Sequence, residues 1–86
     1  MTNVVHCKSG RPYDIYIGRP SMWGNPYQIG IDGTREEVIE KFEAFYLMDG
    51  WMQAHIGELK DKTLGCWCKP LACHGDILVK YAEENS

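Results

Sequence analysis

The chain has 86 residues, of which 44% are hydrophobic and 24% charged, and its net charge at pH 7 is −3. These values indicate one small globular domain over residues 1–86, and they exclude disordered or fibrous classes and a membrane partner, because no apolar run approaches the roughly 20 residues of a membrane helix. Without a basic excess or a signal-peptide layout at residues 1–5, the chain is expected in the cytoplasm and not on nonspecific duplex nucleic acid.

Two short strands are predicted near the N-terminus. Residues 3–7 form a β-branched run that ends at the turn signal Ser9-Gly10-Arg11-Pro12, and residues 13–17 alternate aromatic and aliphatic side chains. We expect a hairpin around residues 8–12 to join them. Glycines and prolines then interrupt regular structure from residue 18 to 33, so this long loop has to pack on itself or carry function.

Helices and one further strand fill the rest of the chain. Residues 34–37 match a capping box and precede an apolar face at helical spacing, which predicts a helix over 34–48. A shorter helix is expected over 51–59, a third strand over 63–67, and a last helix from about residue 74. The order β-β-α-(α)-β-α predicts an α/β or α+β domain with a three-stranded sheet and two to three helices.

The topology brings two chemically rich segments together. The helix over 34–48 is long enough for a crossover, so the second and third strands are expected to pair in parallel. The ends of these strands, Gly18-Arg19 and Cys66-Trp67-Cys68, then meet at one sheet edge. Ligands in open α/β sheets bind at the carboxyl ends of strands. We therefore expect one site that both segments share.

The segment from Cys66 to Asp76 contains three of the four cysteines. Zinc is one interpretation, and its expected ligands are Cys66, Cys68, Cys73 and His74. Nucleophilic chemistry is another: Cys73 at a helix start has a stabilised thiolate and a lowered pKa, with His74 and Asp76 as its catalytic neighbours.

A purely structural interpretation stands beside both. Free cysteines are usually buried, so Cys66 and Cys68 would then belong to the core. On that interpretation His74 bonds the loop backbone and Asp76 caps the helix. The sequence alone leaves these three interpretations open.

The segment from Gly18 to Tyr27 has residues that suit an anionic aromatic ligand. The Arg19 guanidinium matches a phosphate, and Trp23 and Tyr27 offer faces on which a base could stack. Asn25 supplies a fixed amide, and Gly18 permits close approach of the backbone. Ser21 and Gly75 are assigned to the same predicted ligand site. The structural alternative is a rigid loop with Trp23 as its plug.

The two segments resemble the domain-of-unknown-function family numbered 4326. The similarity rests on Ile17-Gly18-Arg19-Pro20-Ser21 with Trp23-Gly24-Asn25-Pro26, and on Leu64-Gly65-Cys66-Trp67-Cys68 with Pro70 and Cys73-His74-Gly75-Asp76. It spans about residues 3–82. The resemblance implies a small cytosolic protein of phage or bacterial origin, in the host cytoplasm if phage-encoded, and supports the two motifs as one site. It implies no assigned activity.

Three functions are carried forward. The first is a protein that binds a small nucleotide-like ligand between the Arg19 loop and the helix start at Cys73, with or without chemistry at the thiol. The second is a module stabilised by zinc, the one cofactor that the residues suggest. The third is a phage-encoded inhibitor that binds a host protein through Trp23, Trp51 and Met52.

Overall fold

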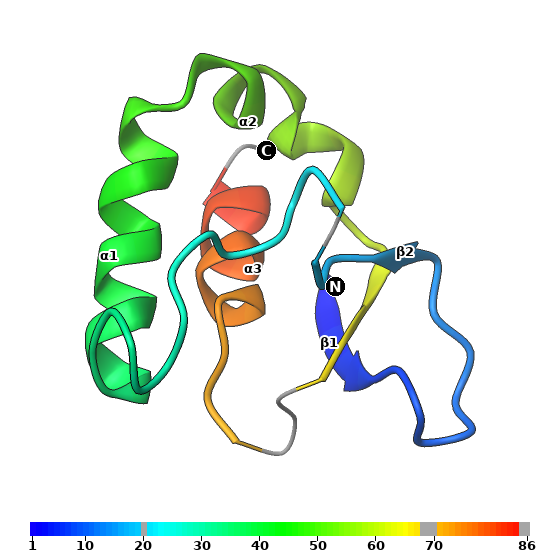
Figure 1. Cartoon of the computed structure of the whole chain (residues 1–86). Helices are drawn as coiled ribbons and strands as arrows, with labels where there is room; N and C mark the ends of the chain where they lie inside the picture. Colours follow the sequence, from blue (N-terminus) through cyan, green and yellow to red (C-terminus); the bar gives the residue numbers. More distant parts are fainter. Residues whose placement is uncertain (20, 68–70, 85–86) are drawn as a thin grey trace.

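The computed structural model describes residues 1–19, 21–67 and 71–84. Its elements follow the predicted order (Figure 1). They are β1 (Asn3–His6), β2 (Ile15–Tyr16), α1 (Arg35–Met48), α2 (Gly50–His55), the 3₁₀ helix η1 (Ile56–Leu59), β3 (Thr63–Cys66) and α3 (Gly75–Glu84). The fold is a small α/β domain, which confirms the predicted class.

The sheet has the strand order β1-β3-β2, and both outer strands are parallel to β3. The parallel pairing of β2 with β3 confirms the crossover prediction. The predicted hairpin of β1 and β2 is wrong, because β3 lies between them. The chain after β1 returns to the start of the sheet, where the Asp14 N–H donates to the Thr63 carbonyl. β3 is the most buried strand, so pairing on both sides also satisfies its backbone groups away from water.

Helix α1 forms where the capping box predicts. The Thr34 side chain accepts from the Glu37 N–H, and the Glu37 carboxylate accepts from the Thr34 N–H. These two bonds satisfy donors that the first helical turn leaves unpaired. Val38, Phe42 and Tyr46 are the buried residues of α1, and their spacing forms one apolar face toward the core.

Helix α3 packs closely on the sheet through Gly75. A Cβ built at Gly75 would lie 2.8 Å from Ile17 Cδ1 and 3.0 Å from Val4 Cγ2. Gly75 was predicted to bind a ligand, but its position shows a packing role: the missing side chain lets the first turn of α3 approach the strands. This contact fixes where the start of α3 lies relative to β1 and the end of β2.

Replacement of Gly75 by alanine is expected to lower the free energy of unfolding by about 1–3 kcal/mol, because the methyl group overpacks this contact. Gly50→Ala is the matched control, since a Cβ there meets no atom within 4 Å. We expect the control to be neutral or slightly stabilising. Urea unfolding of both variants measures the difference, and equal stabilities would contradict the packing role.

The loop between β2 and α1 is held to the core by Trp23, which is 7% exposed. The Trp23 ring lies 5.1 Å from the Trp51 ring, centroid to centroid. The loop also contains two tight turns, in which the Ser21 N–H donates to the Gly18 carbonyl and the Gly24 N–H to the Ser21 carbonyl. The loop therefore packs on itself and on the core. Within the described residues, no helix is long and apolar enough to cross a membrane.

Candidate functional site

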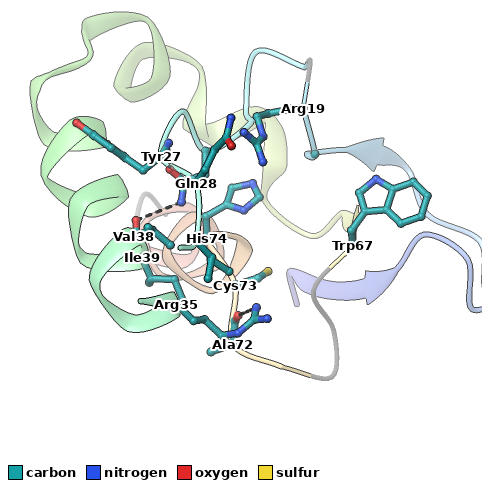
Figure 2. Close-up of a pocket in the computed structure, with 13 residues that line it drawn as sticks. Arg19, Tyr27, Gln28, Arg35, Val38, Ile39, Trp67, Ala72, Cys73 and His74 are labelled. Carbon is teal, nitrogen blue, oxygen red and sulfur yellow. Dashed lines mark hydrogen bonds between the residues drawn. The ribbon is translucent and has the colours of Figure 1, made fainter. Parts of the chain in front are cut away.

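A cavity of about 290 Å³ lies where the β2–α1 loop, the first half of α1, the end of β3 and the start of α3 meet (Figure 2). The residues that line it are Gly18, Arg19, Asn25, Tyr27, Gln28, Ile29, Arg35, Val38, Ile39, Trp67, Ala72, Cys73 and His74. Both sequence segments contribute to this list. The predicted meeting of the two segments at one edge of the sheet is therefore confirmed.

Two arginines give the cavity a positive lining. Arg19 is exposed, and its guanidinium has no hydrogen-bond or carboxylate partner in the part of the chain that the structure describes. Arg35 donates from Nη1 to the Ala72 carbonyl at 3.0 Å, which ties α1 to the segment before α3 and leaves its other N–H groups available. No Asp or Glu occurs among the described residues that line the cavity. A chain of net charge −3 thus has a local excess of positive charge here.

Two aromatic rings border the same space. Trp67 is 53% exposed, and its Nε1 donates to the Tyr16 hydroxyl at 2.5 Å. Tyr27 lies on the side of α1, across the cavity from Trp67 (Figure 2). Of the two predicted stacking faces, Tyr27 lines the cavity, but Trp23 is buried and does not line it. Its apolar area is worth more in the core of so small a domain than on a loop surface.

The thiol of Cys73 is buried and touches a second thiol. Its Sγ lies 3.1 Å from Cys66 Sγ and accepts from the Gly75 N–H at 3.2 Å. The hydrogen bond with Cys66 and burial together raise the pKa of the Cys73 thiol. The predicted lowered pKa is therefore wrong. A helix start favours a thiolate, but burial and the neighbouring Cys66 thiol disfavour the Cys73 thiolate more strongly.

His74 is buried, and its ring is bonded to the backbone of the protein. Its Nε2 donates to the Ile17 carbonyl at 2.8 Å, and the edge of its ring contacts Phe42 at a centroid distance of 5.1 Å. Burial lowers the pKa of the imidazole, and the nearby positive charge of Arg19 acts in the same direction. His74 is thus neutral at pH 7. This contact with the loop backbone agrees with the structural interpretation of the histidine.

Asp76 is at the helix start, where its carboxylate accepts the Cys73 N–H at 3.1 Å. It therefore caps α3. Among the described residues, Cys73 Sγ contacts Cys66 and Gly75 rather than an imidazole, and His74 Nε2 is bonded to a carbonyl. The three residues predicted as catalytic are neighbours, but their contacts do not form a nucleophile, a base and an orienting group.

The remaining predicted ligand residues stabilise the loop. Asn25 donates from Nδ2 to the Val38 carbonyl at 3.1 Å and accepts the Tyr27 N–H at 2.9 Å, so both ends of its amide already have partners. A Cβ at Gly18 would clash with the Tyr16 phenol. Ser21 does not line the cavity, and its Oγ is the buried side-chain polar atom without a hydrogen-bond partner within the described residues.

The predicted zinc ligands come together only in part. Cys66 and Cys73 are in contact, Cys68 lies outside the described residues, and His74 directs Nε2 to Ile17. Within residues 1–19, 21–67 and 71–84, no three His, Cys, Asp or Glu side chains gather as a metal site would require. Of the three predicted protein-binding anchors, Trp23 and Met52 are buried, and only Trp51 is exposed, at 38%.

Comparison with known proteins assigns the chain to a family. The family described as "Domain of unknown function (DUF4326)" matches residues 3–84. The chain belongs to the DUF4326 family. It is 41% identical over 71 residues to an uncharacterised 12.4 kDa protein in the nrdA–td intergenic region of Enterobacteria phage T4, an alignment that covers 77% of the chain and 64% of that relative.

A second relative of this DUF4326 chain is an uncharacterised protein of Acanthamoeba polyphaga mimivirus. The two are 35% identical over 85 residues, which covers 78% of the chain and 65% of the relative. The chain thus spans just under two thirds of the length of both relatives. No solved structure shows significant similarity to it.

Sequence reasoning about this DUF4326 chain found Tyr27 as a residue of the ligand site, but it did not find Arg35 and Trp67. Trp67 carried a signal, because strand alternation after the buried Cys66 turns the next side chain away from the core. Arg35 had no such signal, since it is a helix residue that reaches the cavity only through the packing of α1.

Proposed function

We propose that this DUF4326 chain binds a small nucleotide-like anion in the cavity between the Arg19 loop and the start of α3. The observation that carries the proposal is the lining itself: two arginines and no described carboxylate, in a protein of net negative charge. Arginine presents a fork of donors that matches phosphate oxygens in pairs. The cavity therefore favours a phosphate or similar anion over a neutral metabolite.

The aromatic rings favour a ligand with a planar base. Trp67 and Tyr27 lie on different sides of the cavity, and either ring can stack on a nucleobase whichever base it is. Base stacking on an aromatic side chain contributes about 1–3 kcal/mol. The phosphate on arginine and the base on an aromatic ring together account for both classes of lining residue.

The cavity volume limits the ligand size. At about 290 Å³ it lies near the lower end of small-molecule sites, which span about 300–1,000 Å³. A mononucleotide suits this space better than a dinucleotide or a polynucleotide strand. The dipole of α3 adds to the positive potential. The Gly75 N–H is already bonded to Cys73, so the arginines supply the main contacts.

The test is isothermal titration calorimetry with nucleoside 5′-monophosphates, the matching nucleosides and inorganic phosphate. We expect the monophosphates to bind more tightly than either part alone. Arg19→Ala should weaken binding by about tenfold or more, because a charge-assisted hydrogen bond contributes about 1.5–3 kcal/mol. Its fold should be unchanged, since the Arg19 guanidinium has no partner among the described residues.

Arg11→Ala is the matched control, because Arg11 is an exposed arginine on the β1–β2 connection and does not line the cavity. It should bind as the wild type does. Equal affinities of Arg19→Ala and the wild type, or no heat of binding with any of the nucleotides, would overturn the proposal.

A further inference from the structure

A pair of thiols lies at the junction of β3 and α3. Cys66 ends β3, Cys73 comes shortly before α3, and their sulfur atoms are 3.1 Å apart. Both side chains are 1% exposed. A disulfide bond of about 2.05 Å would need only about 1 Å of approach. Two thiolates on one tetrahedral zinc, at about 2.3 Å from the metal, would be farther apart, at about 3.8 Å.

The two thiols differ in their access to the surroundings. Cys73 lines the cavity, whereas Cys66 is not among its lining residues. Figure 2 shows the Cys73 sulfur below His74, on the side of the cavity where α3 begins. Cys73 is therefore the thiol that a water-sized oxidant in the cavity meets. Cys66 and burial raise the pKa of Cys73, so its reaction is slow, because the thiol must first lose its proton.

We propose that Cys66 and Cys73 are a redox-active dithiol that a peroxide converts into a reversible intramolecular disulfide. The thiol of Cys73 reacts first and Cys66 resolves the product. This inference does not depend on anion binding, because it rests on the contact of the two sulfurs and the access to one of them. Disulfides of this kind in reducing compartments are usually transient and serve catalysis or redox sensing.

The reaction is balanced with hydrogen peroxide as the oxidant. The sulfur of Cys73 attacks one peroxide oxygen, the O–O bond breaks, and a sulfenic acid and one water are formed. The sulfur of Cys66 then attacks the Cys73 sulfur, the S–O bond breaks, and the hydroxyl leaves as a second water with the proton of the Cys66 thiol. Two thiols lose two electrons and two hydrogens, and one peroxide becomes two waters. A dithiol reductant restores both thiols.

The experiment treats the folded wild-type protein with hydrogen peroxide and then counts free thiols by alkylation under denaturing conditions, residue by residue, by tandem mass spectrometry. Cys7 is half-buried and serves as the internal clock for exposure to oxidant. We expect free Cys66 and Cys73 to disappear in equal amounts, more slowly than Cys7 because both are buried, and to return together with dithiothreitol. Alkylation is the readout because peroxide also oxidises the exposed methionines Met22 and Met48.

Two single variants test the order of the steps. In Cys66→Ser the sulfenic acid on Cys73 has no resolving thiol and should be trapped by dimedone. In Cys73→Ser the thiol of Cys66 should stay reduced. Circular dichroism first checks that each variant folds, and the wild-type experiment stands without them if one does not.

Cys68→Ser and Cys7→Ser are the control variants, and both should form the Cys66–Cys73 disulfide as the wild type does. The proposal is overturned if Cys66 and Cys73 are lost in unequal amounts, or if both remain reduced when exposure to peroxide is continued well beyond the complete loss of free Cys7. It is also overturned if the disulfide joins Cys73 to Cys68, or if the purified protein contains one zinc per chain that protects both thiols until a chelator removes it.

Discussion

Replacement of Phe42 by alanine is expected to lower the free energy of unfolding by about 3–5 kcal/mol, the range for a fully buried phenylalanine. A chain of 86 residues has a total stability of roughly 4–13 kcal/mol. Phe42 is 0% exposed and contacts the ring of His74, which lines the cavity, so the variant also loses this contact. The variant should therefore lose a large share of its stability, and where it unfolds it loses the cavity with the fold.

Phe45→Ala is the matched control for Phe42→Ala. Phe45 lies one turn further along α1 and is only partly buried, so we expect a loss of about 1–2 kcal/mol. Urea unfolding followed by circular dichroism measures both values, and Phe42→Leu provides a folded intermediate case. Equal losses in the two alanine variants would show that Phe42 is not the centre of this core.

The second large effect is a loss of stability in weak acid caused by His74. Burial lowers the pKa of this imidazole below its ordinary value of 6.5, against the raising effect of its bonds to the Ile17 and Trp23 backbone. Below pH 6.5 the unfolded chain binds a proton that the folded chain does not, so stability falls as the pH falls. The contribution is complete above the unfolded pKa. It decreases by up to about 1.4 kcal/mol per pH unit until the folded pKa is reached.

The measurement is urea unfolding from about pH 7.5 to about pH 5 for the wild type and His74→Gln. The glutamine amide can still donate to the Ile17 carbonyl, but it does not titrate. The free energy of unfolding of the variant should therefore change less with pH across this range. His55→Gln is the control, since the His55 ring lies at the surface beside Trp51. It should keep the wild-type profile. The same slope in His74→Gln and in the wild type would contradict the buried neutral imidazole.

Local signals were enough to predict most of the fold. The capping box at Thr34 and the apolar spacing after it located α1, because both patterns act within one helix. Parallel pairing of β2 with β3 followed from the crossover between them. The position of β1 did not follow from local signals. Residues 7–10 do form a turn and a bend, but turn residues do not say whether the chain folds back beside a strand or crosses to the far side of another one.

The candidate site was predicted in position and in part of its lining, which includes the predicted Gly18, Arg19, Asn25, Cys73 and His74, but not in the roles of these residues. The meeting of the Arg19 loop with Cys73 followed from topology, and it is the part that the structure confirms. The roles of Trp23 and Asn25 depend on side-chain direction and on competing partners, which a single sequence does not specify. Both side chains stabilise the fold instead of facing a ligand. Trp23 adds apolar area to the core, and Asn25 forms hydrogen bonds with the backbone. Arg35 entered the site only through tertiary packing.

Anion binding in the cavity is tested most directly by nuclear magnetic resonance of the ¹⁵N-labelled chain during titration with a nucleoside 5′-monophosphate. We expect saturable shifts of the backbone amides of Gly18 and Arg19, of the indole N–H of Trp67, and of the amide of His74, because these residues surround the cavity. The amide of Glu58, which does not line the cavity, should not move. Shifts confined to residues outside the cavity, or no saturable shift with any nucleotide, would contradict the assignment of this cavity as an anion site.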